Sequence, residues 1–185
     1  MHNTFINIPN FLTWSRIALI PIFILVFYLP YKWSNIACTI IFSLASITDW
    51  LDGYLARKLN QVSDFGAFLD PVADKLMVAV ALVLLVEKHP TPWLSIPAIV
   101  IVGREIAISA LREWMAELGK RALVKVSFIG KFKTTMQIIA ILFLLYGNPL
   151  FFIPVYEVGI VCLYIAAILT LWSMVIYLQA ARRYF

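Results

Sequence analysis

Four aspartates gather in one short stretch of a chain that is otherwise strongly apolar. They are Asp49, Asp52, Asp70 and Asp74, within the segment DWLDGYLARKLNQVSDFGAFLDPVAD. A carboxylate near the apolar core of a membrane costs roughly 2.5 to 3.5 kcal/mol on insertion scales, so a cluster of them requires compensating positive charge. We expect divalent metal ions to supply that charge.

The spacing of the aspartates predicts how they would be presented. Asp49 and Asp52 are three residues apart, and Asp70 and Asp74 are four apart, which are spacings that place side chains on one face of a helix. Two helices joined by a short loop could turn the two pairs toward each other. Like charges about 4 Å apart repel by about 4 kcal/mol at an effective dielectric of 20, and bound cations would remove that cost.

The ligand types and the neighbouring residues narrow the chemistry. Oxygen ligands without His or Cys favour Mg²⁺, Mn²⁺ or Ca²⁺ over Zn²⁺, and for phosphate chemistry we predict two Mg²⁺, with Mn²⁺ as an alternative. Gly53 and Ala56 leave a shallow floor where a bulky headgroup could approach the backbone. Arg57 could bind phosphate as a fork of donors, although a basic residue reaching toward lipid headgroups would have the same position.

The rest of the chain predicts an all-α integral membrane protein. Its 185 residues are 63% hydrophobic, with a mean hydropathy of +0.91, which exceeds what a soluble domain of this size can bury. We expect one domain over residues 1–185, with six transmembrane helices and a short interfacial helix around residues 5–12 before them. The predicted spans are 14–31, 34–57, 70–88, 93–116, 131–147 and 153–178.

Basic residues predict the orientation, because Lys and Arg are retained on the cytoplasmic side of a membrane. With the N-terminus inside, all of the 15 Lys and Arg residues except Lys32 and Lys88 lie at the inner face or in the inner half of a span. Both termini and the aspartates are then cytoplasmic. The net charge of +5 follows from this topology, so we expect no nucleic-acid partner.

A second polar group lies on the predicted fourth and fifth spans. If Arg104, Arg112, Lys131 and Lys133 converge near the aspartates, they would form an anion pocket for an acceptor that carries its own phosphate. A salt-bridge network between helices is the alternative for the fourth span, and contact with inner headgroups is the alternative for the two lysines. The polar stripe of the fourth span consists of Arg104, Glu105, Ser109, Arg112 and Glu113.

The aspartate segment resembles a known family pattern. Its residues match every fixed position of D-x2-D-G-x2-A-R-x8-G-x3-D-x3-D, which is the signature of the CDP-alcohol phosphotransferase family. The resemblance implies a six-helix transmembrane fold, usually a homodimer, with an active site that opens to the cytoplasm and a pair of divalent ions. The matching residues are Asp49, Asp52, Gly53, Ala56, Arg57, Gly66, Asp70 and Asp74.

The resemblance also implies residue roles. An acceptor hydroxyl would attack the β-phosphorus of a CDP-linked lipid and release CMP. Asp49, Asp52 and Asp70 would chiefly bind metal, and Asp74 would act as the general base and also contact a metal. The remaining signature residues, Gly53, Ala56, Arg57 and Gly66, would bind CDP-diacylglycerol.

Wider similarity suggests the acceptor. The segments NIPNFLTWSRIALIP, FGAFLDPVADKL, GREIAISALREWMAELGK and GKFKTTMQ resemble bacterial members of the family that act at the inner membrane. These members transfer a phosphatidyl group from CDP-diacylglycerol to sn-glycerol 3-phosphate, giving phosphatidylglycerophosphate and CMP. Serine, inositol phosphate or phosphatidylglycerol are alternative acceptors. A cation or proton transporter is the alternative outside the family, but the outer halves of the spans offer almost no polar residues for a path.

Overall fold

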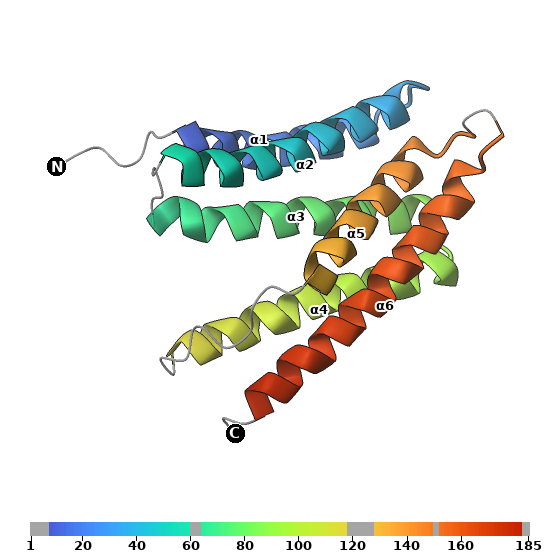
Figure 1. The fold of residues 1–185 in the computed structure, drawn as a ribbon. Helices are drawn as coiled ribbons and strands as arrows, with labels where there is room; N and C mark the ends of the chain where they lie inside the picture. Colours follow the sequence, from blue (N-terminus) through green and yellow to red (C-terminus); the bar gives the residue numbers. More distant parts are fainter. Residues whose placement is uncertain (1–7, 60–63, 118–127, 150–151, 183–185) are drawn as a thin grey trace. The chain divides into compact units, whose positions relative to one another are not determined.

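A computed structural model of the chain describes residues 8–59, 64–117, 128–149 and 152–182. The described residues form six α-helices (Figure 1), which confirms the predicted all-α class. Two of them, α4 and α6, are long and apolar enough to cross a membrane, and shorter apolar stretches occur in α1, α2 and α5. The helices are α1 (Ile8–Phe27), α2 (Ser34–Leu59), α3 (Asp64–Lys88), α4 (Pro92–Glu117), α5 (Phe128–Tyr146) and α6 (Val155–Ala181).

The start and end of α1 differ from the sequence prediction. The helix runs without a break from Ile8 to Phe27, so the expected separate interfacial helix is not seen from residue 8 onward, and residues 5–7 lie outside the described part. Pro9 is tolerated because backbone N–H groups in the first turn of a helix have no acceptor within the helix, so the N–H that proline lacks is not missed. The helix ends at Phe27, before Pro30 and earlier than the predicted end at residue 31, although it continues through Pro21.

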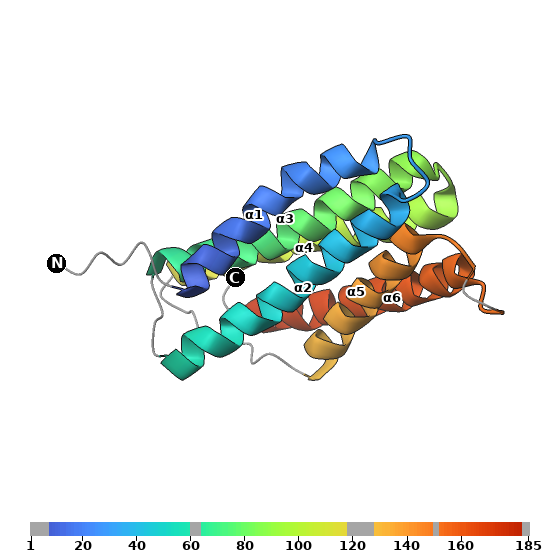
Figure 2. The same ribbon diagram turned by 90° about the horizontal axis from the view of Figure 1, so that it is seen from above.

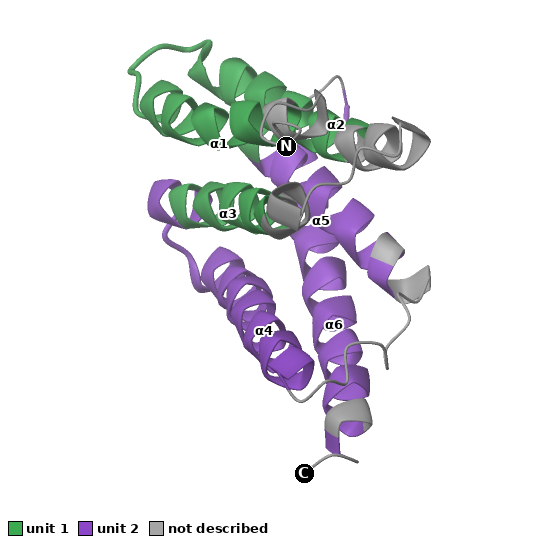
Figure 3. Ribbon diagram, turned by 90° about the vertical axis from the view of Figure 1, so that its left-hand side faces the viewer, with its two compact units in different colours: residues 1–84, 145–147 green, residues 85–144, 148–185 purple. Residues whose placement is uncertain are grey.

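The chain divides into two compact units, shown in different colours in Figure 3. Unit 1 contains residues 1–84 and 145–147. Within it, α1 and α2 pack side by side as an antiparallel pair (Figures 1 and 2). The buried rings of Phe23 and Phe42 meet at this contact, with centroids 6.5 Å apart. The Ser34 hydroxyl donates to the Val26 carbonyl across the turn, so this turn holds the two helices together at one end.

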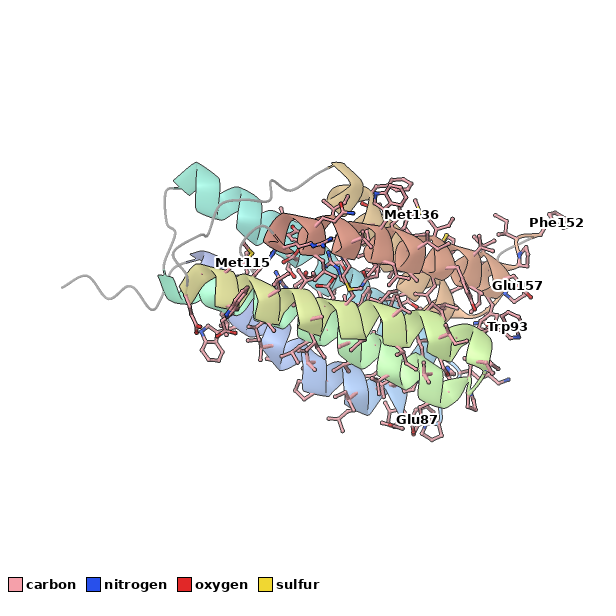
Figure 4. All side chains as sticks on the ribbon, turned by 90° about the horizontal axis from the view of Figure 1, so that it is seen from below. Glu87, Trp93, Met115, Met136, Phe152 and Glu157 are labelled. Atoms are coloured by element: carbon pink, nitrogen blue, oxygen red, sulfur yellow. The ribbon has the colours of Figure 1, made fainter. Side chains whose placement is uncertain are left out.

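Unit 2 contains residues 85–144 and 148–185. Helices α4 and α6 pack side by side in it and run in the same direction (Figure 4). Trp93 and Glu157, near the starts of α4 and α6, lie at one end of this unit, and Met115 lies near the other end of α4. Apolar side chains such as Ile101 and Leu163 are fully buried. The end that holds Met115 also holds the last turns of both helices.

His89 lies in the turn between α3 and α4. Its ring contacts that of Tyr156, with centroids 5.2 Å apart. Burial, and secondarily the positive charge of Lys88, lower the pKa of His89. A neutral imidazole is therefore favoured at neutral pH, and it acts here as a packing group at the start of α6.

One glycine marks a close helix contact within unit 2. A Cβ atom on Gly159 of α6 would lie 3.0 Å from Leu144 Cγ and 3.2 Å from Phe143 Cβ of α5. A Cβ atom on Gly103 of α4 would meet nothing within 4 Å. These two glycines therefore differ in packing although both are helical.

The contrast predicts different responses to the same substitution. Gly159→Val should destabilise the protein by roughly 1 to 3 kcal/mol, because added methyl groups overpack the contact with α5. Gly103→Val has the same change in helix propensity without the clash, so it serves as the matched control. Thermal unfolding in detergent measures both variants, and equal unfolding temperatures would show that the contact does not limit packing.

Candidate active site

The eight signature residues lie on two consecutive helices of unit 1. The backbone is helical through Leu59 and again from Asp64, so the predicted spacings of three and four do place each aspartate pair on one helical face. The side chains of all signature residues except Asp49 and Asp74 lie outside the described residues. Five chain steps join Leu59 to Asp64, which limits their separation to about 18 Å. The signature positions by helix are Asp49, Asp52, Gly53, Ala56 and Arg57 on α2, and Gly66, Asp70 and Asp74 on α3.

The first aspartate of the signature forms an ion pair with α1. Arg16 Nη1 donates to Asp49 Oδ1 at 2.7 Å. The Arg16 side chain is 1% exposed, whereas that of Asp49 is 41% exposed. Asp49 thus neutralises a buried guanidinium and remains accessible to a ligand. From the sequence, Arg16 was expected only to be one of the basic residues in the inner half of a span. A lone charge within an apolar run was the signal that it needed a partner.

The donor set at these positions fits divalent ions. Its four side chains are all carboxylates, and hard cations such as Mg²⁺ take oxygen ligands. A metal ligand must be reachable from solvent. The Asp49 side chain is 41% exposed, and Asp74 on α3 is half-buried, so neither described carboxylate is fully enclosed. These observations are consistent with the expected metal pair, whose ligand set remains a prediction.

A cluster of charged residues lies in unit 2, between α4 and α5. Glu105 Oε1 accepts hydrogen bonds from Lys133 Nζ at 2.6 Å and from Arg104 Nη1 at 3.0 Å. Both cations are buried, with side chains 8% exposed. The structure therefore brings two of the four predicted acceptor residues together and adds a carboxylate between them. Lys131, at the start of α5, has a side chain outside the described residues.

Helix α6 completes the cluster with two residues that the sequence analysis did not anticipate. Arg104 Nη2 donates to the buried Ser173 hydroxyl at 2.9 Å, and Arg112 Nη2 donates to the Tyr177 hydroxyl at 2.6 Å. The Tyr177 ring also contacts both guanidinium groups, with its centroid 5.7 Å from Arg104 Cζ and 5.2 Å from Arg112 Cζ. Cation–π contacts of this kind hold a guanidinium over a ring. Tyr177 thus links the two arginines.

The cluster has an excess of positive charge. Within the described part of the chain, the two buried cations Arg104 and Lys133 share the Glu105 carboxylate, while Arg112 and Glu113 are both exposed. Arg104 Nε is buried and has no hydrogen-bond partner within the part of the chain that the structure describes. An anion with several acceptor oxygens would satisfy both the charge and the donor. The predicted meeting of this cluster with the aspartates stays a prediction.

Comparison with known proteins agrees with the signature. The chain matches the CDP-alcohol phosphatidyltransferase family over residues 6–172. It is 55% identical over 177 residues to a CDP-diacylglycerol–glycerol-3-phosphate 3-phosphatidyltransferase of Sodalis glossinidius, with 96% of each chain covered. Proteins of the same name from Shigella flexneri and Escherichia coli strain K12 are 56% identical over 176 residues, with 95% of each chain covered. The chain therefore belongs to the CDP-alcohol phosphatidyltransferase family.

Proposed function

We propose that this protein transfers the phosphatidyl group from CDP-diacylglycerol to sn-glycerol 3-phosphate, giving phosphatidylglycerophosphate and CMP. The observation that carries the proposal is the complete eight-position signature in a chain that matches its relatives over nearly its whole length. Those relatives are named for this reaction. The excess positive charge in unit 2 supports the choice of acceptor.

The acceptor argument rests on charge. A phosphate monoester carries a charge of about −1.5 to −2 at pH 7 and offers three acceptor oxygens. Arg104, Arg112 and Lys133, opposed by Glu105, leave an excess of positive charge that suits such a group. Serine offers only a carboxylate monoanion beside its own ammonium group, and an unphosphorylated neutral alcohol offers no negative charge. Lys131, at the start of the same helix as Lys133, would add a further cation.

The aspartates would hold the divalent ions and the nucleotide end of the lipid substrate. Asp49, Asp52 and Asp70 would chiefly bind metal, and Asp74 would both contact a metal and act as the base. Two bound Mg²⁺, or Mn²⁺ in their place, would neutralise the diphosphate and stabilise the departing phosphate oxygen. The positions beside them that would admit the diphosphate are Gly53, Ala56, Arg57 and Gly66.

The chain's own residues would then carry the proton and fix the reactants. The cations of unit 2 would hold the acceptor by its phosphate and leave its hydroxyl free. Asp74 would take the hydroxyl proton as the hydroxyl oxygen bonds to the β-phosphorus. The bond from that phosphorus to the bridging oxygen breaks, and CMP leaves with the oxygen. Because a carboxylate is a weak base, we expect positioning to contribute more than basicity.

The same proposal includes a topology. We propose six transmembrane spans in a bacterial inner membrane, with both termini and the active site cytoplasmic and with a homodimer as the functional unit. The shortest of the six helices has 19 residues, close to the roughly 20 needed to cross a hydrocarbon core of about 30 Å. The one-sided distribution of Lys and Arg supports the orientation.

Loss of one signature carboxylate tests the metal role. Asp70→Asn should lower turnover more than roughly a hundredfold at any practical Mg²⁺ concentration, because an amide is a weaker ligand than a carboxylate. Asp64→Asn, the same change at a position outside the signature, is the matched control. Turnover is measured with CDP-diacylglycerol over a range of Mg²⁺ concentrations, and unchanged turnover in Asp70→Asn would exclude an essential ligand role.

The ion pair between α1 and α2 predicts that Asp49 affects stability as well as turnover. Asp49→Ala removes the carboxylate that pairs with the buried Arg16 guanidinium. Breaking a fully buried pair costs about 3 to 5 kcal/mol, and the partial exposure of Asp49 favours the lower end of that range. The double variant Arg16→Met/Asp49→Ala should recover most of the lost unfolding temperature but no turnover. If Asp49→Ala unfolds at the wild-type temperature, the pair contributes nothing to stability.

The acceptor site predicts a selective change in substrate requirement. Lys133→Ala and Arg112→Ala should each raise the KM for glycerol 3-phosphate roughly tenfold or more, since a hydrogen bond to a charged group contributes about 1.5 to 3 kcal/mol. The KM for CDP-diacylglycerol should change much less. Lys32→Ala, in the turn between α1 and α2, is the control. Turnover with serine equal to that with glycerol 3-phosphate would contradict the proposed acceptor.

A further inference from the structure

We propose that the Glu105 carboxylate occupies the acceptor-phosphate site when the acceptor is absent, and that the phosphate of the acceptor displaces it. Glu105 is then a specificity-determining residue that favours dianionic acceptors over monoanionic ones. This inference rests on the proposed function, because it takes the cation cluster of unit 2 as the place where the acceptor phosphate binds.

The first argument is the geometry of the carboxylate. One oxygen of Glu105 bridges two cations from different helices, Lys133 of α5 and Arg104 of α4, at 2.6 Å and 3.0 Å. Phosphate oxygens commonly lie between an ammonium and a guanidinium group in this way. The Glu105 side chain is 23% exposed, so it is the member of the trio with the most access to solvent. It can therefore leave while the two cations remain in place.

The second argument is that Glu105 satisfies the cations incompletely. A guanidinium has five N–H donors, and Arg104 uses Nη1 toward Glu105 and Nη2 toward Ser173. Its Nε is buried and has no hydrogen-bond partner among the described residues. A phosphate group offers three acceptor oxygens and a carboxylate offers two. The donor of Arg104 that Glu105 leaves unsatisfied thus favours a larger anion.

The third argument is the cost of an empty site. Without a carboxylate, Lys133 and Arg104 would be two buried cations with no counter-charge, which is strongly unfavourable. A monoanion that replaced Glu105 would restore only the charge already present, whereas a dianion adds one further negative charge. Exchange is therefore favourable for a phosphate monoester and close to neutral for a monoanion. Because Glu105 competes for the site, it discriminates against monoanionic acceptors.

Inorganic phosphate and acetate are simple probes of this exchange, as a largely dianionic and a monoanionic competitor at pH 8. In Glu105→Gln, phosphate should inhibit with respect to glycerol 3-phosphate at a roughly three- to tenfold lower concentration than in wild type, because one competing charge is removed. Acetate should inhibit this variant but not the wild type. Glu113→Gln, two turns along the same helix at an exposed position, is the matched control and should behave as wild type.

A binding measurement that does not depend on turnover accompanies the inhibition assay. Phosphate should raise the unfolding temperature of Glu105→Gln more steeply than that of the wild type, since a ligand that binds the folded state stabilises it in proportion to its affinity. If Glu105 only ties α4 to α5, the variant will bind phosphate no more tightly than the wild type and will have a lower unfolding temperature. That result overturns the inference.

The failure of this inference is distinguishable from the failure of the proposed function. If phosphate does not compete with glycerol 3-phosphate in the wild type, the cluster is not the acceptor site and both proposals fall. If phosphate competes in the wild type but Glu105→Gln is unchanged or weaker, the acceptor site stands and only the role of Glu105 fails. Should Glu105→Gln not fold, Glu105→Asp retracts the carboxylate by one methylene and should show a smaller shift in the same direction.

Discussion

A charged side chain among apolar helices must meet an opposite charge, because removal of either ion from water costs more than packing can return. This constraint connects the helices of each unit. In unit 1 it joins α1 to α2 through Arg16 and Asp49. In unit 2 it joins α4 to α5 through Glu105 and Lys133, and a hydrogen bond from Arg104 to the neutral Ser173 hydroxyl joins α4 to α6. The polar residues are thus contacts between helices as well as candidates for chemistry.

In each candidate site, these contacts leave one charged group only partly satisfied. Asp49 neutralises a buried arginine, yet its carboxylate stays accessible. Glu105 bridges two buried cations, yet Arg104 Nε has no hydrogen-bond partner in the described part of the chain. The salt bridges themselves tie helices together, and the proposal that the clusters also bind ligands rests on these two additional features.

The all-α class and the helices that carry the signature could be predicted because they depend on local pattern, whereas the site residues themselves stay a prediction. Apolar runs and helical spacing are properties of adjacent residues, so the helices and the faces of the aspartates followed from them. The partner of Arg16 could not be predicted, because it lies 33 residues away and depends on how α1 meets α2. Ser173 and Tyr177 lie in a strongly apolar helix and show their role only beside α4. From residue 8 onward, the interfacial helix expected around residues 5–12 is part of α1, because Pro9 fits the first turn of a helix.

In both clusters the described residues show a buried charge that meets an opposite charge from another helix. Arg16 pairs with Asp49 of the signature, and Glu105 pairs with Arg104 and Lys133. Complete internal neutralisation would stabilise the fold but would leave no electrostatic reason to bind Mg²⁺ or a phosphate. No internal counter-charge would leave buried ions that the empty protein could not tolerate. Partial compensation satisfies both requirements, and it explains why an acidic residue lies in a site proposed to bind an anion.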